Sequence, residues 1–212
     1  MDWQSLVREF VTLFVVIDPV GSIPVFLYAT ASIPKRLHKT FALRAVLAAA
    51  AVLAFFLVAG QLLLEAIGLR LGAFQIAGGI VLFLFALSMI FGEAKPETEI
   101  EEAENEDLSG AVFPLAIPSI ASPGAILAVV ILTDNHETAI AEQAATAGLL
   151  AVVLLITLLI LLLAGRIVKL IGRTGASVVS RVMGLILATV AVDAVLQGLE
   201  QVGVLKLAAA PF

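Results

Sequence analysis

Two proline-containing interruptions lie in the middle of two long apolar segments, one in each half of the chain. The first covers residues 17–24 (IDPVGSIP) and the second covers residues 118–124 (PSIASPG). Irregular backbone survives in hydrocarbon only where protein or a water-filled cavity satisfies its N–H and C=O groups. A matched pair of interrupted spans in two halves of a chain is typical of the substrate site of a secondary transporter. We therefore predict a small membrane transporter whose site forms where the two interruptions meet.

The composition places the chain in a lipid bilayer. Its 212 residues are 61% hydrophobic and 14% charged, whereas a soluble domain has about 45–50% apolar and about 25% charged residues. Several apolar runs reach the roughly 20 residues that cross a membrane as a helix. There are 0 cysteines, which excludes disulfides and thiolate metal sites. No basic cluster indicates nucleic acid, and we predict neither a cofactor nor a metal.

The apolar runs predict an all-α polytopic protein with six membrane spans. The spans cover residues 6–31, 40–66, 71–91, 111–132, 143–165 and 177–199. A dense acidic stretch separates the third span from the fourth and is too polar to pack in a core. We therefore divide the chain into a three-helix repeat at 1–92, an acidic cytoplasmic linker at 93–110 and a second three-helix repeat at 111–212, which together form one membrane domain.

Lysine and arginine predict the orientation, because cytoplasmic loops carry an excess of both. Alternate loops hold most of them: Lys35, Arg36, Lys39, Arg44, Lys95, Arg166, Lys169, Arg173 and Arg181, against Arg8, Arg70 and Lys206 on the opposite side. The richer side should be cytoplasmic. We expect a multi-pass protein of the cytoplasmic (inner) membrane with both termini outside.

The two halves also resemble each other in sequence. Residues 79–82 (GIVL) match residues 184–187 (GLIL), and both segments follow a proline interruption by about 60 positions. An odd number of spans in each half turns the second copy upside down relative to the first. This is the inverted-repeat plan of many secondary transporters.

The residues at the interruptions suggest how a substrate could be held. Asp18 and Ser122 each precede a proline, and both residue types favour the N-cap of a helix whose first position suits proline. Spans 1 and 4 should therefore stop and restart near the midplane, with N–H groups of residues 20–22 and 124–126 facing a substrate carboxylate. Carbonyls of the preceding helix ends would suit an ammonium group. A small zwitterion fits both ends, and the candidate binding residues are Asp18, Pro19, Val20, Gly21, Ser22, Ser119, Ala121, Ser122, Pro123, Gly124 and Ala125.

Simpler structural roles remain open for these residues. The prolines can be ordinary kinks satisfied by neighbouring helices, and Asp18 can serve as a cap alone or contact a proton or an ammonium group. Asp193 lies within span 6, opposite Ser88 in the repeat, where it can line the cavity or play a structural part behind the site. Gly79 and Gly184 are expected to allow close helix packing.

Several segments resemble a known membrane-protein family. Residues 18–26 (DPVGSIPVF) resemble the first signature of the MarC family, which usually begins Asn-Pro, and residues 114–126 (PLAIPSIASPGAI) are similar to its second signature, which usually has glycine where Ser122 stands. Residues 74–79 (FQIAGG) and 181–187 (RVMGLIL) also resemble family segments. The resemblance covers nearly the whole chain and implies a six-span inner-membrane protein, with members described as small neutral amino acid transporters (SnatA-like). The departures at Asp18 and Ser122 alter charge and access at the site.

The main hypothesis is a secondary transporter, and not an enzyme, that moves a glycine- or alanine-like amino acid by rocking one repeat against the other. An ATP-driven mechanism is not predicted because no phosphate-binding motif is present. The alternatives are a cation carrier that uses Asp18 and Asp193, or a non-transporting membrane regulatory protein. The sequence leaves the coupling ion and the oligomeric state open, and it is compatible with a coupling proton and with a homo-oligomer.

Overall fold

The computed structural model describes residues 2–91, 108–133 and 138–206, and these ranges contain helices and no strand. Four helical segments are long and apolar enough to cross a membrane: Lys35–Ala66, Leu71–Phe91, Ile140–Leu170 and Val178–Gln201. Two further pairs of helices qualify together, each bent at a short break, which gives up to six spans when each pair counts as one. The predicted all-helical membrane fold is therefore confirmed. The predicted linker lies mostly outside the described residues.

The first bent pair consists of α1 (Trp3–Ile17) and α2 (Ser22–Ala29), whose axes differ by 40°. Asp2 caps the start of α1, and its Oδ1 accepts a hydrogen bond from the Ser5 backbone N–H at 2.8 Å. Hydrogen bonding by the Ser5 side chain and by its backbone N–H lowers the pKa of the Asp2 carboxyl, which lies just before the first helix. A short 3₁₀ turn, η1 (Lys35–Leu37), then leads into α3 (His38–Ala66).

A tight connection joins α3 to α4 (Leu71–Phe91). Gly68 adopts φ +71°, a left-handed conformation that glycine accepts without steric cost. The Leu69 N–H bonds to the Leu64 carbonyl at 2.8 Å across this turn, as in a common helix C-cap. The predicted end of the second span at residue 66 is confirmed.

The second half begins with η3 (Leu108–Ala111) and η4 (Val112–Ile120), followed by α6 (Pro123–Leu132). Segments η4 and α6 are inclined by 51°. The last helix, α7 (Ile140–Gln201), contains both remaining spans. Between them the chain turns at Gly172, which has φ +68°. A glycine bend within α7 thus stands where the sequence predicted a loop between two separate helices.

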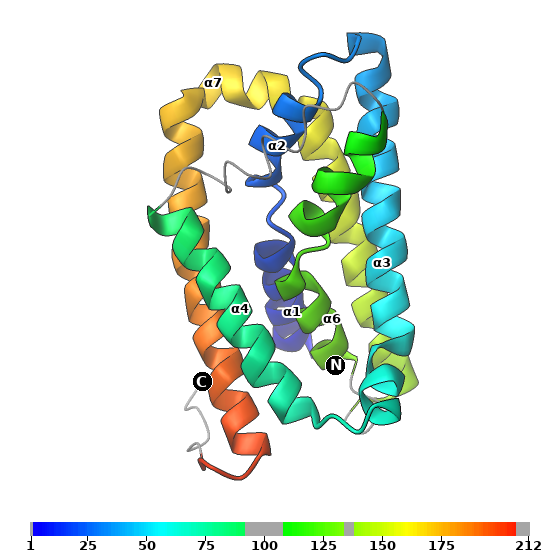
Figure 1. The fold of residues 1–212 in the computed structure, drawn as a ribbon, viewed down its shortest axis with the longest axis vertical. Coiled ribbons are helices and arrows are strands. Elements are labelled where there is room, and N and C mark those ends of the chain that lie inside the picture. The colour runs from blue at the N-terminus through cyan, green and yellow to red at the C-terminus, as the bar shows by residue number, and fades with distance from the viewer. Residues whose placement is uncertain (1, 92–107, 134–137, 207–212) are drawn as a thin grey trace.

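The two halves run through the bundle in opposite senses (Figure 1). Helices α1 and α2 rise from the lower end, α3 descends and α4 rises, whereas η4 and α6 descend, the first part of α7 rises and its second part descends. The start of α1 and the end of α7 both lie toward the lower end. In this view the two bent pairs lie between α3 on one side and α4 with the second part of α7 on the other.

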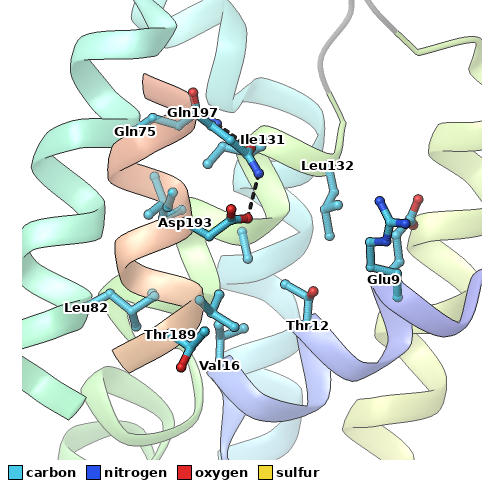
Figure 2. A pocket seen from close by; sticks show the side chains of 16 residues that line it. Glu9, Thr12, Val16, Gln75, Leu82, Ile131, Leu132, Thr189, Asp193 and Gln197 are labelled. Atoms are coloured by element: carbon cyan, nitrogen blue, oxygen red, sulfur yellow. Dashed lines mark hydrogen bonds between the residues drawn. The ribbon is translucent and has the colours of Figure 1, made fainter. Parts of the chain in front are cut away.

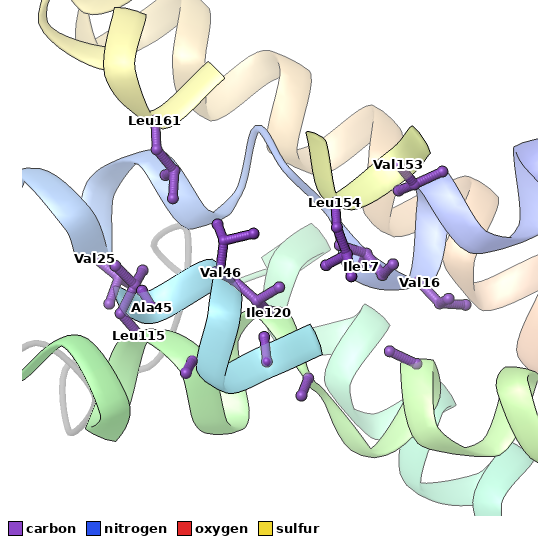
Figure 3. Packing of buried hydrophobic residues seen from close by; sticks show 14 of the residues in the cluster. Val16, Ile17, Val25, Ala45, Val46, Leu115, Ile120, Val153, Leu154 and Leu161 are labelled. Atoms are coloured by element: carbon purple, nitrogen blue, oxygen red, sulfur yellow. The ribbon is translucent and has the colours of Figure 1, made fainter. Parts of the chain in front are cut away.

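The apolar core surrounds the two bent pairs. Leu13 and Ile17 of α1, Leu115 and Ile120 of η4, and Leu161 of α7 are each at most 1% exposed. Figure 3 shows that Ile17, Ile120 and Leu154 belong to a cluster that also includes side chains of α2 and α3. The irregular backbone between the paired helices is therefore enclosed by protein, as hydrocarbon requires.

Candidate functional site

Asp18 organises the first interruption. It has φ +48° and closes α1, and its N–H bonds to the Phe14 carbonyl at 3.1 Å. Its carboxylate Oδ1 then accepts the Gly21 N–H at 2.9 Å, and its carbonyl accepts the Ser22 N–H at 3.2 Å and the Ser22 hydroxyl at 3.1 Å. The second helix consequently starts at Ser22, with Gly21 at its N-cap.

This geometry corrects the sequence prediction for the first half. Asp18 ends one helix instead of beginning the next, and Pro19 is not the first residue of α2. Aspartate tolerates the left-handed region better than most residues, because its short side chain can bond the local backbone. The N–H groups of Gly21 and Ser22, which were expected to face a substrate, are already taken by Asp18 itself.

The second interruption is longer than the sequence predicted. Phe113 and Ile117 have extended φ and ψ angles inside η4, and each precedes a proline. A residue before proline is driven out of the helical region by the pyrrolidine ring, and Pro114 and Pro118 also lack the N–H that a helix would use. The break in span 4 is therefore not confined to residues 118–124, since residues 112–120 are irregular at two points.

Ser122 behaves as the sequence predicted. It is the N-cap of α6 with φ −68° and ψ 159°, and Pro123 occupies the first turn. Its Oγ accepts the Ala125 N–H at 3.1 Å, and its carbonyl accepts the Ile126 N–H at 3.0 Å. Of the three N–H groups expected to face a substrate in this half, those of Ala125 and Ile126 are thus occupied by Ser122, which leaves that of Gly124.

The structure brings the two interruptions into direct contact. The Ser119 hydroxyl donates to the Ser22 hydroxyl at 3.2 Å, and the Ser122 hydroxyl donates to the Val16 carbonyl at 3.0 Å. Asp18, Ser22, Ser119 and Ser122 are each at most 2% exposed. Four polar side chains from distant parts of the sequence therefore form one buried cluster inside an apolar bundle.

We expect Ser122→Ala to lower the free energy of unfolding by about 1–2 kcal/mol, because it removes an N-cap and a link between the two halves. Unfolding of the purified protein in mixed detergent micelles would measure this. Ser88→Ala is the matched control, since the Ser88 hydroxyl bonds at 2.7 Å to the Phe85 carbonyl of its own helix. Equal losses in both variants would contradict a link between the halves.

A cavity of about 400 Å³ lies beside this cluster, between α1, α4, α6 and the second part of α7. Val16 and Gly124 line it next to the interruptions, and Arg8, Asp193 and Gln197 line its more exposed part. The volume lies within the range of about 300–1,000 Å³ that small-molecule sites occupy. A Cβ atom at Gly124 would collide with the Leu82 side chain, so glycine here permits close packing of α6 on α4.

One wall of the cavity carries three hydrogen-bonded polar side chains, shown in Figure 2. Gln75 of α4 donates from Nε2 to Oε1 of Gln197 at 3.4 Å, and Gln197 donates from Nε2 to Oδ2 of Asp193 at 2.7 Å. On the opposite side, Oε2 of Glu9 accepts a hydrogen bond from the Thr146 hydroxyl at 2.7 Å. Glu9 therefore joins α1 to α7.

The sequence analysis selected only part of this cavity. Of the predicted residues, Gly124 and Asp193 line it, whereas Ser88 bonds its own helix and Gly79 and Gly184 pack between α4 and α7. Gln75 and Gln197 were missed. An amide inside a very apolar helix is the signal that could have indicated Gln75, and the four-residue spacing of Asp193 and Gln197 on one helix face could have indicated the pair.

The other predicted residues belong to the buried interruptions. Pro19, Ala121 and Ala125 are buried, Val20 is half-buried and Pro123 is exposed. Among the described residues, no group of three or more His, Asp or Glu side chains is placed to hold a metal. Asp193 lines the cavity and Asp18 does not, so no observation favours the cation-carrier hypothesis, which needs both carboxylates in one site.

Comparison with known proteins gives the family. Residues 3–202 match the family model described as MarC family integral membrane protein. A UPF0056 membrane protein of Methanocaldococcus jannaschii is 37% identical over 94% of this chain and 98% of its own length. YvbG of Bacillus subtilis, also described as a UPF0056 membrane protein, is 34% identical over 94% and 96%.

The UPF0056 inner membrane protein YhgN of Escherichia coli is 30% identical over 93% of this chain and 97% of its own length. No solved structure matches the chain at a significant level. The family model spans both interruptions and both halves, and the relatives align over nearly their whole length. The chain therefore belongs to the MarC family of integral membrane proteins.

Proposed function

We propose that this protein is a secondary transporter for a small neutral amino acid, glycine- or alanine-like, in the cytoplasmic membrane. One observation carries the proposal: the interruptions of the two halves hydrogen-bond to each other through Ser22, Ser119 and Ser122, directly beside a cavity of about 400 Å³. Irregular backbone at membrane depth is tolerated where it lines a cavity, and discontinuous helices at such a point form transporter substrate sites.

The helix packing supports an inverted repeat. A Cβ atom at Gly79 would lie 2.9 Å from the Ala191 carbonyl oxygen, and one at Gly184 would lie 3.1 Å from the Ala86 carbonyl oxygen. The 105 positions that separate Gly79 from Gly184 also separate Ala86 from Ala191. Each contact is therefore the image of the other, as in a two-fold interface where residue i meets j and j meets i. The opposite directions of the two halves agree with this relation (Figure 1).

The substrate's carboxylate is assigned to the start of α6. The Gly124 N–H lies in the first turn of this helix, where the helix dipole favours an anion, and Gly124 borders the cavity. Transport would then follow from rocking one repeat against the other around this point. Both termini would lie outside the cell, as the distribution of lysine and arginine predicts.

Uptake into liposomes tests the proposal. Liposomes that contain the purified protein should take up radiolabelled glycine or alanine above protein-free liposomes, with and without an imposed proton gradient to identify coupling. Gly124→Val should reduce this uptake to background, since its side chain would meet Leu82 and narrow the cavity. Gly148→Ala is the control, because no atom lies within 4 Å of its new Cβ.

The uptake experiment also distinguishes the transporter proposal from the hypothesis of a non-transporting membrane protein. If the folded protein in liposomes moves none of the neutral amino acids under either condition, the transporter proposal fails and a non-transporting regulatory protein becomes the better hypothesis.

A further inference from the structure

Gln75, Gln197 and Asp193 form a hydrogen-bonded chain along one wall of the cavity, which we name the amide–carboxylate chain (Figure 2). It connects α4 with the second part of α7 and lies apart from the interruptions. The Gly124 N–H is assigned to the carboxylate of the substrate. The ammonium group of a zwitterion therefore still needs a site.

The orientation of both amides follows from the carboxylate. An ionised carboxylate only accepts hydrogen bonds, so Gln197 must turn its NH₂ group toward Asp193. Its Oε1 then faces Gln75, which must in turn present its own NH₂ group. The order of donors and acceptors along the chain is therefore fixed by charge, and it leaves Oε1 of Gln75 at the far end.

That terminal oxygen lacks a donor. Gln75 is 1% exposed and lines the cavity, and its Oε1 accepts no hydrogen bond from the part of the chain that the structure describes. A buried acceptor without a donor costs stability. An unsatisfied amide oxygen beside a cavity is explained if a ligand supplies the missing donor.

We propose that the amide–carboxylate chain binds the ammonium group of the substrate, with Oε1 of Gln75 and the carboxylate of Asp193 as its acceptors. This inference rests on the proposed function and specifies one half of the substrate site. An ammonium group has three donors and a positive charge, whereas this wall presents acceptors and one formal negative charge.

The carbonyls near the interruptions are less suitable for this role. The Asp18 carbonyl already accepts two hydrogen bonds from Ser22, and the Val16 carbonyl accepts one from Ser122. The expectation that helix-end carbonyls would receive the ammonium group is thus replaced by a side-chain site on α4 and α7. The neighbouring Thr189, which also lines the cavity, donates its hydroxyl to the Leu185 carbonyl of its own helix at 3.1 Å.

Binding to the purified full-length protein in detergent tests the inference, with glycine and methylammonium chloride as separate probes. Asp193→Asn should weaken glycine binding about ten- to hundredfold, as expected for the loss of a charge-assisted hydrogen bond. Asn can still accept from Gln197, and Asp193 is exposed, so the fold should be retained. Glu200→Gln, an exposed carboxylate on the same helix outside the cavity lining, should leave binding unchanged.

A second variant gives a signature that a merely structural role would not produce. Gln75→Leu removes the unsatisfied acceptor, so the thermal midpoint without ligand should stay equal or rise while glycine binding falls. A lowered midpoint with unchanged glycine affinity would overturn the inference.

The two probes distinguish failure of the inference from failure of the proposed function. Glycine binding that is equal in wild type, Asp193→Asn and Gln75→Leu overturns the ammonium site and leaves transport standing. Methylammonium binding that depends on Asp193, without any glycine binding, supports the site and contradicts the transport proposal. If sodium chloride stabilises the protein in a way that depends on Asp193, and methylammonium has no effect, the wall binds a metal cation and the inference is overturned. The absence of all binding also overturns the inference.

Discussion

Gly21→Ala is expected to destabilise the protein by about 3–5 kcal/mol and to abolish the proposed transport. A Cβ atom at this position would overlap the Asp18 carboxylate, and the three nearest atoms all belong to that side chain. Asp18 is 1% exposed, so its carboxylate has no solvated position to move into. The substitution therefore adds overpacking, about 1–3 kcal/mol, to the loss of a hydrogen bond to a carboxylate, about 1.5–3 kcal/mol. Unfolding in mixed micelles and uptake into liposomes would measure both effects.

Two further variants show whether the Asp18 side chain causes the destabilisation by Gly21→Ala. Gly148→Ala is the same substitution at a helical position where no atom lies within 4 Å of the new Cβ, and it should leave stability unchanged or raise it by up to about 1 kcal/mol. The double variant Asp18→Gly/Gly21→Ala removes the clash and keeps a residue that accepts φ +48°. It should be more stable than Gly21→Ala alone. If it is equally unstable, the clash with Asp18 is not the reason for the glycine.

Gly198→Ala is expected to cost about 2–3 kcal/mol of stability by forcing α4 away from the second part of α7. The new Cβ would lie 2.7 Å from the Gly72 carbonyl oxygen and 3.0 Å from the Ile76 backbone nitrogen. These are backbone atoms, so no rotamer change relieves the contact. Small residues let membrane helices approach closely, and filling such an interface costs about 1–3 kcal/mol of overpacking as well as lost packing contacts. Thermal unfolding in detergent would measure the loss.

Gly165→Ala serves as the control for this interface. It lies in the same long helix, and no atom lies within 4 Å of its added Cβ. Its stability should equal or slightly exceed that of the unmodified protein. Equal stability of Gly198→Ala and Gly165→Ala would show that the close approach of α4 and α7 is not needed for the fold.

Both predictions concern positions that require glycine, but the physical requirement differs between them. The sequence indicated only one of the two requirements, which is close helix packing. The sequence analysis associated Gly79 and Gly184 with close helix packing, and the structure places both between α4 and α7. Gly21 was expected to contribute to a substrate site, whereas its space is filled by Asp18. A local spacing of three residues does not reveal that the aspartate folds back onto the following backbone.

The polar wall of the cavity could not be predicted for a related reason. Gln75 and Gln197 are 122 positions apart in the chain, and the resemblance at residues 74–79 did not single out Gln75. Their contact depends on how α4 crosses the second part of α7, which is set by small residues on both helices. The pairing therefore follows from tertiary packing, whereas Gly124 and Asp193 could be selected because each is unusual within its own segment.

The sequence by itself determined that this chain is a helical membrane protein and that its two proline-rich segments leave regular helical geometry. Apolar runs of bilayer length and the missing N–H of proline act locally, so they can be read without coordinates. Only the tertiary structure decided which backbone groups at the interruptions remain open and which side chains face the cavity. Those outcomes depend on contacts between α1, η4, α4 and α7, which join residues roughly a hundred or more positions apart in the chain. The way these segments cross decides which polar atoms become hydrogen-bonded and which remain open.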